Sequence, residues 1–232
     1  MGLLRILYRD KRLVAIDKPE RLLVHRTRLA RDHTFALQLL RDQIGQFVYP
    51  LHRLDRATSG VLVFALDPES ARAFCELFAS RQARKEYIAV VRGFTDETGR
   101  IEHALREEKG APEQEAVTEY TRLATAELPV PVGPHASARY ALVRAEPHTG
   151  RMHQIRKHFK HISHPLIGDT QHGDGRHNRL FRERFGCRRL LLHAQRITLP
   201  HPTTGHGLTI EAPVPAEMTS LFTELGWQTA TT

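Results

Sequence analysis

The sequence has little cysteine: Cys75 and Cys187 are its only two among 232 residues. Their wide separation matches no metal-binding or disulfide spacing, which excludes a disulfide scaffold and indicates a reducing compartment. Long apolar runs are also lacking, since the longest, Gly60–Leu66, falls far short of the ~20 residues that span a bilayer. Five of the first twelve residues are charged, so no signal-peptide core can form there. We therefore expect a cytoplasmic protein without a membrane segment.

Acidic side chains are in deficit as well, with 26 Asp and Glu against 34 Lys and Arg and a net charge of +8. This balance, with an isoelectric point of about 9.9, favours a polyanionic partner, nucleic acid first and a membrane surface second. The hydrophobic fraction of 41% and the charged fraction of 26% are typical of a folded globular chain. Without repeats, low-complexity tracts or a hinge-like linker, residues 1–232 are expected to form one domain.

The order of strand and helix signals predicts an α+β fold, because strands and helices do not alternate as βαβ units would. We expect a mixed, largely antiparallel central sheet with flanking helices. Residues 94–116 are polar and are expected to form an irregular, exposed excursion. Strands are predicted at 4–8, 13–17, 61–66, 86–91, 117–123, 140–146, 190–199 and 208–211. Helices are predicted at 36–43, from Asp67 past Phe78, and at 151–161, 180–185 and 216–225.

The segment His52–Gly60 concentrates polar chemistry in a loop before a buried strand. Asp55 lies between Arg53 and Arg56, and nearby cations keep a carboxylate ionised, so that it can act as a nucleophile or stabilise charge. The alternative is a structural turn, in which Asp55 accepts hydrogen bonds from the backbone that follows it. The residues alone leave both interpretations open.

A second polar segment, Thr149–His158, begins with a glycine that permits a sharp entry into a basic helix. Its donors suit the recognition of phosphates or base edges, although a solvated basic face would have a similar composition. The donors crowd into about two helical turns: Arg151, His153, Gln154, Arg156 and His158.

Histidine is abundant enough, at 15 residues, that a metal site has to be weighed. His158, His161 and His164 recur at every third residue, a spacing that rotates away from one helical face. No paired cysteines, His-Glu-x-x-His motif or acidic cluster accompanies them, so we expect no metal site. Tyr87 begins a predicted strand, where it would be either an ordinary half-buried tyrosine or a platform for an unpaired base.

Taken together, these segments resemble the RluA branch of the pseudouridine synthases. His52–Gly60 is similar to the His-Arg-Leu-Asp-x-x-Thr-Ser-Gly signature of that family, and the likeness extends along almost the whole chain in the same order. The other matching segments are Lys18-Pro19 with Val24-His25, Lys85-Glu86-Tyr87, Thr149–Arg156 with His164–Asp169, and Leu191–Ala194 with His201-Pro202.

The resemblance implies the pseudouridine synthase catalytic fold, with an active-site cleft across the sheet. It implies that Asp55 is the catalytic aspartate, that Arg156 is its ion-pair partner and that Tyr87 packs on the target uracil. Ile155 would form an apolar wall of the pocket. Substrate binding is expected from a set of residues in the same motifs: Arg53, His52, Ile155, Arg151, His153, Gln154, His25 and Arg26.

The implied activity is the isomerisation of uridine to pseudouridine in structured RNA. Because nothing is oxidised and no group is supplied from outside, no cofactor is expected. Within the branch, three segments look most like the members that modify uridine 65 in the T stem of tRNA: 24–26, 129–134 and 185–190. Ribosomal RNA or another tRNA position is the alternative substrate. A non-catalytic RNA-binding module and a metal-dependent phosphoesterase are alternatives of other classes.

Two departures from the family pattern concern loop geometry. The family has glycine where this chain has Arg21, and again where it has Ser163 before His-Pro. Many relatives carry a small RNA-binding domain ahead of the catalytic domain, but the early Lys18-Pro19 motif leaves no room for one. We therefore expect a monomer whose catalytic domain recognises RNA by itself, through Arg26, Arg28 and Arg31 and the basic helix.

Overall fold

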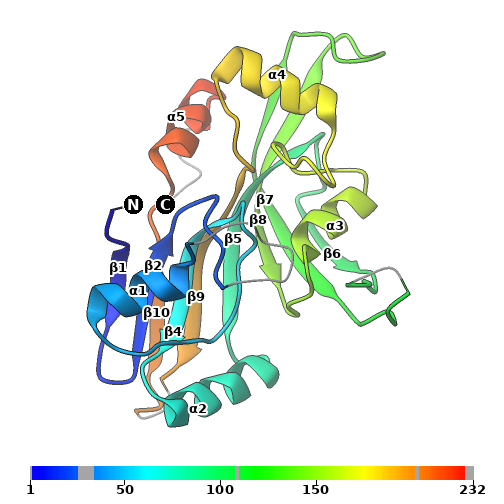
Figure 1. Cartoon of the computed structure of the whole chain (residues 1–232). Coiled ribbons are helices and arrows are strands. Elements are labelled where there is room, and N and C mark those ends of the chain that lie inside the picture. Colours follow the sequence, from blue (N-terminus) through cyan, green and yellow to red (C-terminus); the bar gives the residue numbers. More distant parts are fainter. Residues whose placement is uncertain (1, 26–33, 108–109, 202–203, 228–232) are drawn as a thin grey trace. The chain divides into compact units, whose positions relative to one another are not determined.

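The computed structural model describes residues 2–25, 34–107, 110–201 and 204–227 (Figure 1). The chain divides into two compact units, each discontinuous in sequence. Unit 1 comprises residues 1–85 and 194–213, and unit 2 comprises residues 86–193 and 214–232. The α+β prediction is confirmed, because each unit is built on antiparallel strands flanked by helices. The single domain and the cleft across the sheet stay predictions.

Unit 1 is a sheet in the order β1, β2, β4, β9, with β3 paired to β4 and β10 paired to β9. Every residue of β4 is buried, as its continuous apolar run predicts. The helix α2 begins after Asp67, whose carboxylate accepts from the Ser70 N–H at 2.8 Å, and Phe74 of this helix enters the core. The elements of unit 1 are β1 (Arg5–Arg9), β2 (Leu13–Lys18), α1 (Ala36–Ile44), β3 (Tyr49–Pro50), β4 (Ser59–Ala65), α2 (Pro68–Ala79), β9 (Leu192–Pro200) and β10 (Gly207–Glu211).

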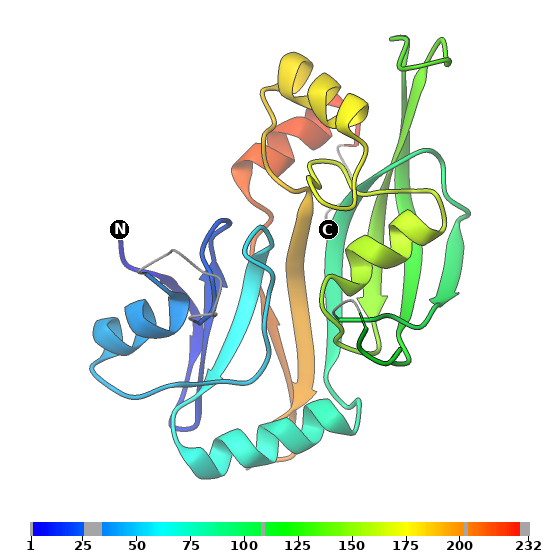
Figure 2. The same cartoon turned by 45° about the vertical axis from the view of Figure 1, so that its right-hand side comes forward.

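Unit 2 is a sheet in the order β5, β8, β7, β6. Its main core contains Ile88 and Leu142 from the strands, Phe181 from α4, and Leu221 from α5. The other face of the sheet carries α3, where the Phe159 ring lies 5.3 Å from the Tyr120 ring of β7. Figure 2 shows α4 (yellow) beside α5 (red), and α3 (yellow-green) against the green strands. The elements of unit 2 are β5 (Arg84–Arg92), β6 (Thr98–Glu102), β7 (Val117–Leu128), β8 (Ala138–Pro147), α3 (Gln154–His161), α4 (Gly175–Phe185) and α5 (Ala216–Glu224).

Three local predictions were wrong. The excursion 94–116 contains the strand β6, which is hard to see in the sequence because only Ile101 of its five residues is buried. The helix α4 begins at Gly175 rather than 180, because the Asp174 carboxylate caps it by accepting from the Arg176 N–H at 3.0 Å. The helix α3 begins at Gln154 rather than 151, because His153 has a left-handed backbone with φ of 57°.

Candidate active site

Asp55 lies in the turn that leads into β4. The Thr58 N–H donates to the Asp55 carbonyl oxygen at 3.0 Å, which closes the turn, while Thr58 and Ser59 are buried. Gly60 ends the turn with φ of +113°, and a side chain there would collide with the Ala194 backbone. The local sequence therefore holds Asp55 on a rigid base, half-buried, between the exposed side chains of Arg53 and Arg56.

Lys18 anchors this turn from the end of β2, a role that the sequence analysis missed. Its side chain is fully buried, and its ammonium group donates to the carbonyl oxygens of Pro19 and Leu22, both at 2.8 Å. It also reaches the carbonyl oxygen of Arg56 at 3.4 Å. A buried charge is tolerated only when it is well hydrogen-bonded, and these bonds join the loop after β2 to the loop that carries Asp55. The signal in the sequence is a lysine that ends a strand whose first four residues are apolar.

His52 is neutral and acts as a hydrogen-bond acceptor. Its Nε2 accepts from the Val63 N–H at 3.2 Å, and its ring stacks on Phe78 with centroids 5.5 Å apart. Burial and the neighbouring positive charge of Lys85 lower the pKa of His52 to about 3. Burial also lowers the pKa of Lys85 to about 8. His52 therefore holds the Asp55 turn against β4 in unit 1.

In unit 2, Tyr87 lies on the face of the sheet that carries α3. Residues of a strand alternate between faces, and Ile88 belongs to the core on the α4 side, so Tyr87 points the other way. Tyr87 is paired with Ala145, which is paired with Tyr120, and Tyr120 contacts α3. Tyr87 is 9% exposed. The sheet therefore brings Tyr87 to the same face as Ile155 and Arg156 of α3.

Arg156 is held in place by a buried carboxylate. Its Nε and Nη2 atoms donate to the two carboxylate oxygens of Asp169 at 2.7 and 2.9 Å, and Nη2 also donates to the Gln171 side chain at 3.2 Å. Burial alone would raise the pKa of Asp169, but Arg156 and the N–H groups of Gln171 and His172 outweigh it and lower that pKa. Asp169 belongs to one of the family-like segments but is not among the predicted site residues. Its partner Arg156 is 13 residues away in the sequence, so no local pattern indicates the pair.

Gln154 anchors the first turn of α3 to β7. Its Oε1 accepts from the Thr149 hydroxyl at 2.6 Å and from the Arg151 N–H at 3.0 Å. Its Nε2 donates to the Val117 carbonyl oxygen at 2.9 Å and to the Thr118 hydroxyl at 3.0 Å. These four bonds use the full capacity of the amide, so this side chain is fixed by the protein. Its part in substrate binding stays a prediction.

Three further predicted site residues, Arg151, His153 and Ile155, belong to unit 2. His153 bonds to His172 through ring nitrogens 3.0 Å apart, and Arg151 is half-buried and donates to the Glu115 carbonyl oxygen at 3.1 Å. Ile155 is 6% exposed, and His25 is exposed in unit 1. Arg26, Arg28 and Arg31 lie outside the described residues. The roles of all these residues in substrate binding stay predictions, and so do the catalytic roles of Asp55, Tyr87 and Arg156.

The histidines weighed as metal ligands have other partners. The His158 ring bonds to the Thr118 hydroxyl at 2.9 Å and to the His103 carbonyl oxygen at 3.0 Å. His161 stacks on His103 with centroids 3.8 Å apart, and His164 donates to the Arg92 carbonyl oxygen at 2.8 Å. Across the described residues, no three metal-ligating side chains converge. Nor is any helix in that part of the chain both long and apolar enough to cross a membrane.

Both departures from the family pattern occupy backbone positions that favour glycine. Arg21 has φ of 63° and Ser163 has φ of 66°, a left-handed conformation that is unfavourable for residues with a Cβ atom. The carbonyl oxygen of Arg21 accepts from Nε of Arg56 at 3.2 Å, so the unusual conformation is held by the Asp55 loop. The expectation that these positions concern loop geometry agrees with their backbone angles.

Comparison with known proteins relates the chain to one protein family. Residues 12–161 match the family model described as RNA pseudouridylate synthase. The chain is 47% identical, over 97% of both chains, to a protein of Vibrio cholerae serotype O1 named tRNA pseudouridine synthase C. A protein of the same name from Haemophilus influenzae is 44% identical over 97% of this chain and 99% of its own length.

Solved structures show a similar fold. Human RNA Pseudouridylate Synthase Domain Containing 4 superposes with a TM-score of 0.74 at 27% identity, covering 96% of this chain and 93% of that chain. Human RNA Pseudouridylate Synthase Domain Containing 1 gives a TM-score of 0.71 at 24% identity, covering 91% and 84%.

Proposed function

Because this chain belongs to the RNA pseudouridylate synthase family and is a pseudouridine synthase, we propose that it isomerises one uridine of tRNA with Asp55 as the catalytic residue. The observation that carries the choice of substrate is the likeness, over 97% of this chain, to proteins named tRNA pseudouridine synthase C. Uridine 65 in the T stem is the proposed target. Ribosomal RNA or another tRNA position is the alternative.

The reaction rearranges the substrate without any net gain of atoms. The glycosidic bond between the ribose and a ring nitrogen breaks, the uracil turns, and a ring carbon bonds to the same ribose carbon. That ring carbon loses a proton, and the released nitrogen gains one. Asp55 supplies the anion that this chemistry needs, by covalent attack or by stabilising charge near the anomeric carbon. The rigid turn described above supports this role, because a catalytic group has to be held in place.

Arg156 is proposed to pair with Asp55 and keep it ionised. Its orientation is fixed in advance by the bidentate contact with Asp169, so little freedom is lost when the guanidinium binds a second anion. Asp169 is then a positioning residue. This arrangement also explains why a carboxylate as deeply buried as Asp169 is retained beside the predicted site.

Tyr87 and Ile155 are proposed to hold the uracil. They lie on the same face of the unit 2 sheet, and both are largely buried, which suits a pocket that excludes water while the freed base turns. Arg53 is proposed to enter the space that the uridine leaves when it flips out of its stem. Contacts to the rest of the RNA are assigned to Arg151, His153, His25 and Arg26, while His52 and Gln154 are proposed to act indirectly, by positioning the Asp55 turn and the first turn of α3.

The experiment that tests the proposal incubates the purified protein with tRNA from a strain that lacks the gene. New pseudouridines are then mapped by carbodiimide-stop sequencing, with ribosomal RNA treated in parallel. We expect one new site at uridine 65, in the presence or absence of EDTA. Asp55→Asn should abolish the signal while the fold is retained, because it keeps the shape of the side chain and removes its charge.

The matched control is Asp42→Asn, which removes the charge of an aspartate with 66% side-chain exposure on α1 and should leave activity unchanged. A signal at another tRNA position or in ribosomal RNA would replace the proposed target while keeping the enzyme class. Undiminished isomerisation by Asp55→Asn would reject the catalytic assignment.

A further inference from the structure

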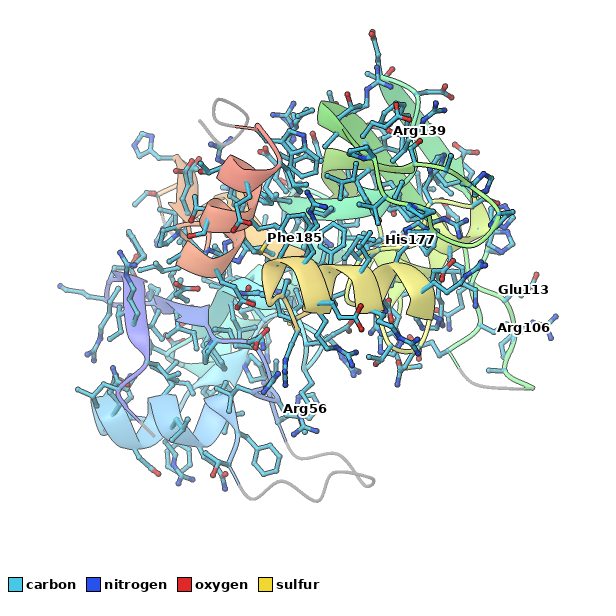
Figure 3. The ribbon with its side chains drawn as sticks, turned by 90° about the horizontal axis from the view of Figure 1, so that it is seen from above. Arg56, Arg106, Glu113, Arg139, His177 and Phe185 are labelled. Atoms are coloured by element: carbon cyan, nitrogen blue, oxygen red, sulfur yellow. The ribbon has the colours of Figure 1, made fainter. Side chains whose placement is uncertain are left out.

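A cationic cavity of about 560 Å³ lies within unit 2, and its lining includes neither Tyr87 nor Arg156. It lies where the hairpin between β7 and β8, the end of β5, and the start of α4 meet. Its volume falls in the range of sites that hold ligands. Figure 3 labels two of its lining residues, Arg139 on β8 and His177 on α4. Its basic lining residues are Arg92, Arg139, Arg176, His135, His164 and His177.

Arg92, at the end of β5, is held in this cavity by two hydrogen bonds. Arg92 pairs with the Asp174 carboxylate at 2.8 Å and donates to the Ser163 carbonyl oxygen at 3.0 Å. The Arg176 guanidinium lies over Gly133, where an added Cβ atom would meet it and displace it. Gly133 has φ of +62°, a left-handed conformation that favours glycine in the hairpin turn. The wall formed by Arg92 is therefore fixed by its contacts with Asp174 and Ser163, while Arg176 and Arg139 are exposed side chains that can turn toward a ligand.

Positive charge exceeds negative charge around the cavity. Asp174 is shared by Arg92 and Arg176, the second at 3.6 Å, while Arg139 pairs with Glu127 at 3.2 Å at an exposed position. Exposed ion pairs of this kind are weak and exchange readily for a stronger anion. Burial lowers the pKa of His177, and its Nδ1 bonds to the Tyr140 hydroxyl at 2.8 Å.

The charge continues from the cavity along α4. Arg179 and Arg182 follow Arg176 at intervals of three residues, and all three are exposed. Residues three apart are neighbours on a helix surface, so the Arg179 side chain lies beside Arg176, whereas Arg182 lies about 120° round the helix from Arg176. Arg139 also lies over the Phe94 ring, 5.3 Å from its centroid, and Phe94 is 38% exposed.

We propose that this cavity and the adjoining Arg179 of α4 bind the phosphodiester backbone of the RNA substrate, through residues other than Tyr87, Ile155 and Arg156. Guanidinium groups match phosphate oxygens through paired N–H donors, and cations contributed by β5, β8 and α4 suit a polymer with several phosphates better than a single small anion. The inference rests on the proposed function for its choice of RNA. It adds a contact surface that the family motifs quoted above do not include.

The test compares two double variants with the same net charge. Arg139→Gln/Arg176→Gln removes two cations from the cavity, and Arg100→Gln/Arg106→Gln removes two exposed cations elsewhere in unit 2, on β6 and in the loop after it. Binding of an unmodified tRNA transcript is measured by fluorescence anisotropy at several salt concentrations. All proteins carry Asp55→Asn, so that binding is measured without turnover.

We expect the cavity variant to bind roughly tenfold more weakly or worse, as the loss of charge-assisted hydrogen bonds implies. Two lost phosphate contacts should also flatten the dependence of log K on log salt by about 1.4 to 1.8. The control variant should change neither quantity appreciably. Equal weakening in both variants, or none in either, would overturn the inference.

Two further arms keep the outcome unambiguous. Arg139→Lys/Arg176→Lys preserves the charge, so RNA binding by this variant should keep most of its salt dependence. If this variant binds RNA as weakly as the Gln variant while its thermal midpoint is unchanged, the proposed electrostatic contact with phosphates is refuted. Calorimetry with inorganic phosphate alone distinguishes a small-anion site, since phosphate binding with unaltered RNA affinity contradicts the inference. If the variants show RNA binding through the cavity but the unaltered protein forms no pseudouridine in the sequencing experiment above, only the proposed function is rejected.

Discussion

At the scale of single residues, the Arg156–Asp169 pair is the contact on which the predicted site most depends. Both side chains are almost completely buried, at 7% and 0% exposure, and the pair is bidentate. Replacing one member of such a pair leaves the other as an uncompensated buried charge. The pair therefore links the stability of unit 2 to the orientation of a predicted catalytic group.

Asp169→Asn tests this link. We expect the free energy of unfolding to fall by about 3 to 5 kcal/mol, as measured by urea titration, and isomerisation to slow through kcat. Because the pKa of Asp169 is lowered in the folded state, its stabilising contribution is present above the ordinary carboxyl pKa and is lost as pH falls through the folded value. The wild type should therefore lose its advantage over the variant in acid.

Asp42→Asn again serves as the control, because the same change at an exposed position should alter stability by less than about 0.5 kcal/mol. A fully stable Asp169→Asn protein with unchanged kcat would contradict both the structural and the positioning role.

The predicted site also shows which features of single residues can be predicted from the sequence and which cannot. The type and order of polar groups in His52–Gly60 were readable because they form a local pattern. The Arg156–Asp169 pair was not, because a buried ion pair depends on how α3 and the loop after it pack. The backbone of His153, with φ of 57°, could not be foreseen either, since nothing in a histidine indicates a left-handed conformation.

At the scale of elements, the same distinction separates α2 from β6. The start of α2 was predicted because its capping aspartate and proline are adjacent in the sequence. The strand β6 was missed because it pairs only with β7 and shows no apolar alternation. Helix α4 lies between these cases: Asp174 caps its start, but the segment before residue 180 is rich in glycine, histidine and aspartate, a composition that is typical of loops.

The turn from β3 into β4 should make the fold sensitive to acid. Folded His52 has a pKa of about 3, whereas an unfolded histidine titrates near 6.5. Below pH 6.5 the unfolded chain takes up a proton that folded His52 refuses, so stability falls as pH decreases. Between pH 7 and pH 5 we expect this histidine to reduce the free energy of unfolding by about 2 kcal/mol.

The measurement compares thermal or urea unfolding of the wild type and His52→Gln at both pH values. Glutamine keeps an oxygen that can accept from the Val63 N–H but has no titrating ring, so the variant should lose less stability on acidification. An identical pH response in the two proteins would show that His52 does not titrate as described.

At the scale of the whole molecule, each core is assembled from parts of the chain that are distant in sequence. The core of unit 1 combines Leu13, Val63 and Phe74 with Ile197 and Ile210. The core of unit 2 likewise depends on residues of α5 near the end of the described chain. Such long-range contacts cannot be derived from local propensity, which is why the strands were predicted but the two units were not.

Ile210→Ala measures what the late strand β10 contributes to unit 1. Ile210 is 3% exposed, and its truncation should lower the free energy of unfolding by about 2 to 5 kcal/mol, as measured by urea titration. Thr209→Ala, at the exposed neighbouring position of β10, is the control and should have little effect. Equal effects of the two changes would contradict the placement of Ile210 in the core.

The discontinuity of unit 1 has a consequence for synthesis on the ribosome. Residues 1–85 emerge first, but β9 and β10 follow only after about 110 more residues, which at 5 to 20 residues per second takes roughly 5 to 20 seconds. During that interval the nascent chain displays the apolar strand β4 without the partner strand β9. Chaperone capture should therefore concentrate on this early segment, and ribosomes that stall before residue 194 should yield products destined for degradation.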